Sequence, residues 1–153
     1  MEPIRVTDTV QIIKELQDAI DAELLAAYQY WAAYQISSGP GKYDADDIFE
    51  EHAEQEWEPV KLLTKRFKEL GGSLRTDLYN IPKPDKNSYA LHGVDVRSLS
   101  RDIQEAEDRA VVRYTRLTDM TRTTDPATYL LASTILSTEL EHQYEIKVLV
   151  HSL

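Results

Sequence analysis

The chain has 153 residues, a length that suits one domain with a sizeable core. Its formal net charge of −10 disfavours direct binding to a nucleic-acid backbone. It has no cysteine, which excludes disulfides and thiolate metal sites, and no apolar run long enough to span a membrane. The first residues lack the basic and apolar regions of a signal peptide. We therefore expect one domain over residues 1–153 in a cytoplasmic protein.

Glycine and proline breaks divide the chain into four long segments with helical periodicity. The expected helices cover residues 9–36, 44–70, 96–122 and 126–150. Acidic residues open the second segment and basic residues close it, as the helix dipole favours. Gly71 suits the left-handed position after that segment, and Asp125 with Pro126 is typical of a helix start.

The connections between these segments differ in length. The first and third are short, whereas the middle one, residues 71–95, is long and carries prolines. Short, long, short is the order that joins two antiparallel helical hairpins by a crossover. The sequence therefore predicts an all-α protein, a four-helix bundle with a long crossover between its second and third helices.

Two of the expected helices carry the same pattern. The stretches 23–30 and 107–114 each place a glutamate, an alanine and a tyrosine at positions i, i+3 and i+7: Glu23, Ala26 and Tyr30, then Glu107, Ala110 and Tyr114. A further carboxylate follows each of them, Glu56 after 33 residues and Glu139 after 32. Each glutamate alone fits a solvated helix residue, but the repeat of the whole pattern favours a shared site.

Glu139 and His142 form a Glu-x-x-His step, and this spacing puts both side chains on one helix face. A glutamate from each of two helices, combined with such steps on others, is how bundles build a paired-metal carboxylate site. Burying glutamates is costly unless they are paired or bind a metal. An oxygen-rich set with one imidazole suits iron or manganese.

The stretches 23–30, 51–72 and 125–142 resemble the ferritin-like diiron proteins, near the bacterioferritin and Dps-like mini-ferritin branches. The resemblance covers nearly the whole chain. It implies a ferritin-like four-helix bundle and a dinuclear iron site, with manganese as an alternative metal. It also implies ferroxidase activity with O2 or peroxide, and iron storage or detoxification in a closed homo-oligomer of about 12 or 24 subunits. The residues that it assigns to the metals are the terminal ligands Glu23 and Glu107, the bridges Glu56 and Glu139, and His142.

The sequence departs from the family pattern at Pro59, where a histidine is expected three residues after Glu56. Proline offers no ligand and removes a backbone N–H, so it predicts a kink at the site and a weaker metal position beside Glu23. His52 lies on the same face as Glu56 and could substitute, but we interpret it as a surface residue of a charged turn. Trp57 stands where bacterioferritins can have a haem-ligating methionine, so we expect no haem.

Three points stay open at this stage. The bundle could be a non-storage diiron or dimanganese oxidoreductase, or a structural protein with an impaired metal site. Tyr30 could be a core residue, or a hydrogen-bond donor or electron source beside the metals. Clustered aromatic side chains on the first helix predict a subunit contact: Tyr28, Trp31 and Tyr34.

Overall fold

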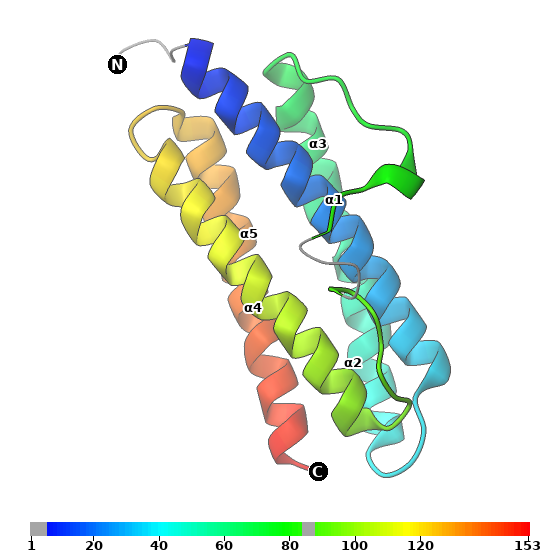
Figure 1. The fold of residues 1–153 in the computed structure, drawn as a ribbon. Helices are drawn as coiled ribbons and strands as arrows, with labels where there is room; N and C mark the ends of the chain where they lie inside the picture. Colours follow the sequence, from blue (N-terminus) through cyan, green and yellow to red (C-terminus); the bar gives the residue numbers. More distant parts are fainter. Residues whose placement is uncertain (1–5, 84–87) are drawn as a thin grey trace.

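The computed structural model describes residues 6–83 and 88–153, which form an elongated bundle of helices (Figure 1). Residues 1–5 of the expected domain and residues 84–87 of the expected crossover lie outside the described residues. The described elements, in chain order, are α1 (Val6–Ile36), α2 (Lys42–Gln55), α3 (Trp57–Glu69), the 3-10 helix η1 (Leu78–Asn80), α4 (Val96–Thr121) and α5 (Pro126–His151).

The helices form two antiparallel hairpins. α1 packs against α2 and α3, and α4 packs against α5. The described parts of the connection, residues 70–83 and 88–95, lie along the bundle, and α4 starts at the end opposite to the end of α3 (Figure 1). Near α4 this crossover is fixed to the α1–α2 turn, because the Ser38 backbone N–H donates to the Val94 carbonyl at 2.8 Å. The predicted fold class is therefore confirmed, with α2 and α3 together forming the second arm.

The predicted helix boundaries hold to within three residues, because local end signals set them. The Asp95 carboxylate caps α4 by accepting from the Ser98 N–H at 3.0 Å. The Asp125 carboxylate caps α5 by accepting from the Thr128 N–H at 3.3 Å. Gly71 follows α3 with a φ of 91°, the left-handed conformation expected of it.

The second arm is interrupted at Glu56, one of the predicted site residues. α2 ends at Gln55 and α3 begins at Trp57, with Glu56 between them at φ −65° and ψ −17°. Pro59 is buried and has no N–H to offer the Gln55 carbonyl, so the hydrogen-bond ladder is broken there. The predicted kink takes the form of a break, and Glu56 lies on it.

Two apolar clusters fill the bundle, one toward each end. Leu16, Leu63 and Ile135 belong to the first, and Phe49, Leu99 and Ile146 to the second. Each such side chain stabilises the fold by about 1.5–3 kcal/mol when fully buried. A layer of buried polar residues separates the clusters along α1, α4 and α5. Within the described ranges, no helix combines the length and the apolar content that a membrane crossing requires.

Candidate metal centre

Five buried side chains meet in the polar layer, each at most 3 % exposed: Glu23 of α1, Glu56 at the helix break, Glu107 of α4, and Glu139 and His142 of α5. One potential ligand atom from each of four of them lies within 4.8 Å of all the others; these four are Glu56, Glu107, Glu139 and His142. Glu23 is outside this tight group. It lies close enough for its charge, second to burial, to raise the pKa of Glu56 and of Glu139. The structure thus brings all five predicted site residues together, with Glu23 at the edge.

The imidazole of His142 has one nitrogen toward the carboxylates and one away from them. Nδ1 lies 3.1 Å from Glu56 Oε1, 3.7 Å from Glu139 Oε2 and 3.9 Å from Glu107 Oε1. Nε2 lies 2.9 Å from the side-chain oxygen of Gln55, the last residue of α2. An acceptor there favours a hydrogen on Nε2, which leaves the Nδ1 lone pair facing the carboxylates.

The carboxylates are held in an environment that disfavours their charge. Burial, and then the charge of neighbouring carboxylates, raises the pKa of Glu56, Glu107 and Glu139 well above the ordinary value. One oxygen of each of these three side chains is buried and has no hydrogen-bond partner among the described residues. This environment disfavours the carboxylate form, and a bound cation would offset that cost, so the donor set fits a divalent metal.

Two tyrosines hold the outer glutamates in a crossed arrangement. The Tyr30 hydroxyl of α1 donates to Glu107 Oε1 of α4 at 2.6 Å, and the Tyr114 hydroxyl of α4 donates to Glu23 Oε1 of α1 at 2.5 Å. Burial, and next the partner glutamate, raises the pKa of each phenol well above its ordinary value. Both tyrosines therefore stay protonated and act as donors.

Sequence comparison places this arrangement in a family. The model of the ferritin-like domain matches residues 13–153. The chain belongs to the ferritin family. A relative from Pyrococcus furiosus, named a DNA protection during starvation protein, is 28% identical over 138 residues, which cover 89% of this chain and 75% of that protein.

Solved structures of ferritin relatives have the same fold. A dodecameric thioferritin, the bacterioferritin-related protein of Bacteroides fragilis, superimposes with a TM-score of 0.85 at 28% identity, covering 94% of this chain and 86% of that one. A ferritin-like diiron-carboxylate protein of Bacillus anthracis reaches a TM-score of 0.82 at 20% identity, covering 95% and 99% of the two chains. At that identity the second likeness concerns the fold alone.

The structure corrects the interpretation of His52 in this ferritin-family chain. We predicted a surface residue, which is wrong: the side chain is 1 % exposed. It lies one turn before Glu56 on the inward face of α2, where its ring stacks on that of His142 at a centroid distance of 4.1 Å. Its Nε2 lies 2.6 Å from Glu145 Oε2, and its Nδ1 has no partner among the described residues. His52 is outside the tight group, and its contact with the centre is the stacking of its ring on that of His142.

Arg113 is a neighbour of the centre that sequence reasoning missed. Burial lowers its pKa, but Tyr89, Tyr114 and Glu23 outweigh that effect and raise it. The guanidinium also favours the ionised form of Glu139. Little in the sequence indicates Arg113, because the residue is not part of the repeated pattern and only precedes Tyr114, which is. The Glu23 side of the centre therefore has an arginine charge nearby, whereas the Glu107 side has an imidazole.

Proposed function

We propose that this ferritin-family protein binds iron at the centre, oxidises Fe(II) as a ferroxidase, and stores or detoxifies the product. The observation that carries the proposal is the convergence of four buried residues, Glu56, Glu107, Glu139 and His142, whose potential ligand atoms all lie within 4.8 Å of one another. Burying that many acidic groups is costly unless a cation compensates them. A divalent metal supplies that compensation.

Each residue then has a role that follows from its place. Glu56 and Glu139 would bridge two metal ions, Glu23 and Glu107 would each hold one, and His142 would bind through Nδ1 while Gln55 fixes its ring. Fe(II) bound there would be the substrate, and each ion would give up one electron to O2 or peroxide to become Fe(III). Manganese accepts the same oxygen and imidazole donors and is the alternative metal.

We propose that the working form is a closed homo-oligomer. Large apolar side chains are exposed on the outer side of α1 and at the start of α3: Tyr28 is 66 % exposed, and Trp31 and Trp57 are each 51 % exposed. Tyr28 and Trp31 also pack against each other, with ring centroids 5.7 Å apart. Exposed apolar surface of this kind usually marks a protein contact. The Bacteroides fragilis relative is described as dodecameric.

A second candidate function is that of a discrete diiron or dimanganese oxidoreductase. Pro59 favours it, because a metal position without its histidine leaves room for an outside ligand. The two functions differ in the iron that each chain retains. After gel filtration of aerobically loaded protein, a storage assembly should retain far more iron than one dinuclear centre can hold, in a high-mass species by light scattering. A discrete enzyme should retain only the iron of the centre.

The test of the proposed site is an anaerobic Fe(II) titration followed by exposure to O2. We expect the unmodified protein to bind Fe(II) saturably and to show the absorbance of Fe(III) after oxygen is added. Glu139→Gln should lose both. Glu141→Gln, an exposed glutamate on the same helix, is the matched control and should keep both. Iron binding by Glu139→Gln equal to that of the control would refute the assignment of the site.

A further inference from the structure

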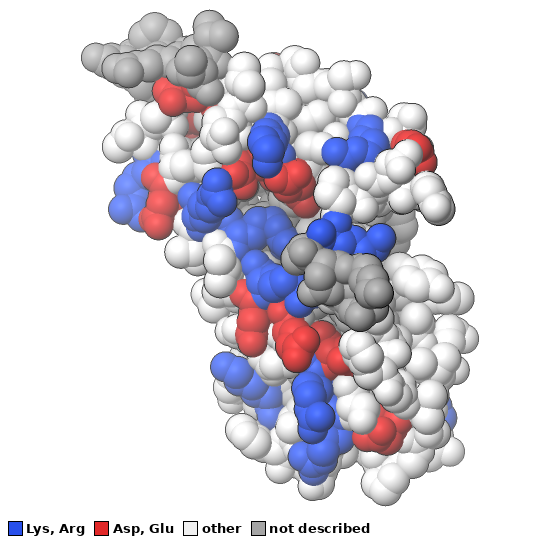
Figure 2. Space-filling view, in the orientation of Figure 1, with Lys and Arg blue, Asp and Glu red and all other residues white. Residues whose placement is uncertain are grey.

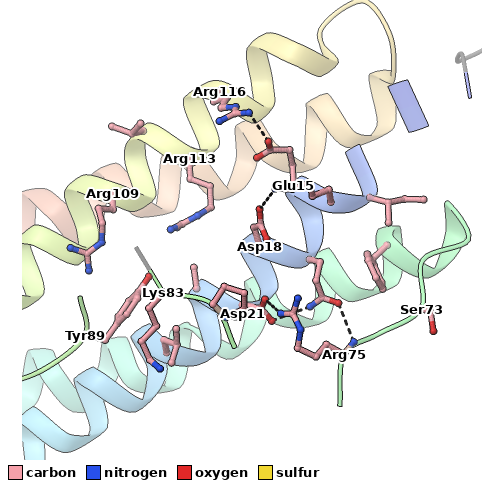
Figure 3. Close-up of a pocket in the computed structure, with 18 residues that line it drawn as sticks. Glu15, Asp18, Asp21, Ser73, Arg75, Lys83, Tyr89, Arg109, Arg113 and Arg116 are labelled. Atoms are coloured by element: carbon pink, nitrogen blue, oxygen red, sulfur yellow. Dashed lines mark hydrogen bonds and ion pairs between the residues drawn. The ribbon is translucent and has the colours of Figure 1, made fainter. Parts of the chain in front are cut away.

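A second polar site lies on the outer face between α1, α4 and the crossover. It is a cavity of about 770 Å³ whose walls include charged side chains from all three elements (Figure 3). The acidic ones come from α1, namely Glu15, Asp18 and Asp21. The basic ones are Lys14, Arg75, Lys83, Arg109, Arg113 and Arg116. The cavity therefore has an excess of positive charge in a chain of net charge −10.

Each of the three acids already has a basic partner. Lys14 Nζ lies 3.1 Å from Asp18 Oδ2, and Arg116 Nη2 lies 2.8 Å from Glu15 Oε1. Asp21 is paired with Arg75. No carboxylate of the described residues lies within ion-pair distance of the other three cations, Lys83, Arg109 and Arg113. Figure 2 shows the lysine and arginine side chains gathered in the middle of this face.

Arg109 and Arg113 are held in place one turn apart on α4. The Arg109 guanidinium lies over the Tyr89 ring, 4.9 Å from its centroid, and Arg109 also donates to the Ser88 carbonyl. Its Nε is buried and has no hydrogen-bond partner among the described residues. Arg113 extends from α4 toward α1 (Figure 3), and Tyr89 is among the residues that raise its pKa against the effect of burial. A buried donor without a partner is costly, and an acceptor oxygen of a ligand would satisfy the Arg109 Nε.

The chemistry of the walls selects the class of ligand. Two fixed guanidinium groups present planar sets of N–H donors, which match the oxygens of a tetrahedral oxyanion. We propose that this cavity binds a small oxyanion of the phosphate class on Arg109 and Arg113. The ligand is either free phosphate or the phosphate group of a small molecule. Arg113 is also a neighbour of the carboxylate centre, but the proposal does not depend on metal binding there.

The test is calorimetric titration of the metal-free protein with inorganic phosphate at fixed ionic strength, with chloride as the non-oxyanion comparison. We expect saturable binding of one phosphate per chain. Arg113→Gln and Arg109→Gln should each weaken it by about tenfold or more. Arg101→Gln removes the same charge from an exposed position of α4 outside the cavity, and it should bind phosphate like the unmodified protein. Circular dichroism and melting temperature check the fold of each variant.

Two sources of the phosphate group can be told apart in the same experiment. A nucleoside monophosphate is added as a competitor of inorganic phosphate. If it binds more tightly than inorganic phosphate does, the ligand is a small organic phosphate. If it binds equally or more weakly, the ligand is the free ion. The proposal would be overturned by the absence of saturable phosphate binding, or by an equal loss in Arg101→Gln. Binding of a short duplex DNA without binding of inorganic phosphate would also overturn it, because the basic surface would then contact a nucleic-acid backbone.

Discussion

In each half of the carboxylate centre, an outer glutamate accepts a hydrogen bond from a tyrosine of the other hairpin. The halves differ in the nitrogen-bearing side chain that lies beside this glutamate. In the α4–α5 half, Glu107 accepts from Tyr30, and His142 Nδ1 lies 3.9 Å from Glu107 Oε1. In the α1–α3 half, Glu23 accepts from Tyr114, and Pro59 stands where the ferritin pattern would place a histidine. A guanidinium, that of Arg113, interacts with Glu23 instead.

The comparison distinguishes the positions of the side chains, which a repeated sequence pattern specifies, from their affinity for a metal, which it does not specify. The repeat specifies where the carboxylates and tyrosines lie, because their spacing on α1 and α4 is the same. It does not specify equal affinity for the proposed metal ions, because Pro59 offers no ligand where the family pattern has a histidine, and the nearby charge of Arg113 would oppose a cation. We therefore expect two unequal metal positions that share the bridges Glu56 and Glu139, with the position beside Glu107 the tighter one.

The largest effect should come from removing one outer glutamate at a time. Glu107→Gln should weaken the tight Fe(II) step by about 100-fold or more, since it removes a direct ligand rather than an outer contact. Glu23→Gln should leave the tight step nearly unchanged and abolish only the weak one. Anaerobic Fe(II) titration with a competing chelator measures both steps. Equal losses in the two variants would mean that the halves are equivalent.

A smaller effect should follow from restoring the missing ligand. Pro59→His should strengthen the weak step by about tenfold, because it adds an imidazole beside Glu23. Pro59→Ala is the matched control: it restores the backbone N–H that Gln55 lacks but supplies no ligand. The same titration on both variants separates the two contributions. If Pro59→Ala strengthens the weak step as much as Pro59→His does, the helix break rather than the missing ligand causes the asymmetry.

Replacing either tyrosine by phenylalanine should reduce the free energy of Fe(II) binding by about 1 kcal/mol, the usual value of a hydrogen bond. Each replacement should act on the glutamate of the other hairpin. Tyr30→Phe should weaken the tight step, because its hydroxyl bonds to Glu107 rather than to the glutamate of its own helix. Tyr114→Phe should weaken the weak step. Each variant should also lower the melting temperature of the metal-free protein by about 2–4 °C. A pattern in which each tyrosine affects the glutamate of its own helix would contradict the crossed geometry.

The effect that is smallest at neutral pH concerns His52. Burial, and then the charge of His142, lowers the pKa of His52 from 6.5 to about 3, while Glu51 acts in the opposite direction. The unfolded chain takes up a proton as pH falls below 6.5, but the folded protein does so only near 3. The stabilising contribution of the neutral ring is therefore complete above pH 6.5 and is lost as pH falls toward 3.

The measurement for His52 is the melting temperature of metal-free protein over that pH range. His52→Gln should melt close to the unmodified protein near neutrality and should lose less stability on acidification. The groups that face His52 are Glu145, His142 and Tyr30, and they are unchanged in the variant. His151→Gln, at the exposed end of α5, is the control and should follow the unmodified protein. Parallel acid profiles for the two variants would show that His52 does not titrate as described.

The fold was predictable because its determinants are local. Asp95, Gly71 and Asp125 define helix ends through their own backbone and side-chain chemistry, so the predicted boundaries agree with the structure. The long middle connection predicted the crossover for the same reason. Even the break in the second arm was predictable, because Pro59 removes a hydrogen bond whatever the tertiary context.

For the site, only the residues that recur at helical spacing were predictable. Helical spacing placed the five candidate residues in one layer, but it says nothing of contacts between helices. The burial of His52 depends on the face that α5 presents to α2, and Arg113 reaches the centre from the outer surface of α4. The partners of the tyrosines were hidden for the same reason, because each one bonds across to the other hairpin.

The crossed hydrogen bonds have a mechanical consequence. They connect α1 to α4 at two heights, and these helices belong to different hairpins. Sliding one hairpin past the other by a single helical turn, about 5.4 Å, would break both bonds together and separate the outer glutamates. The two hydrogen bonds therefore oppose sliding of the two hairpins along the bundle axis. With metal bound as proposed, these bonds would limit changes in the distance between Glu23 and Glu107 during oxidation.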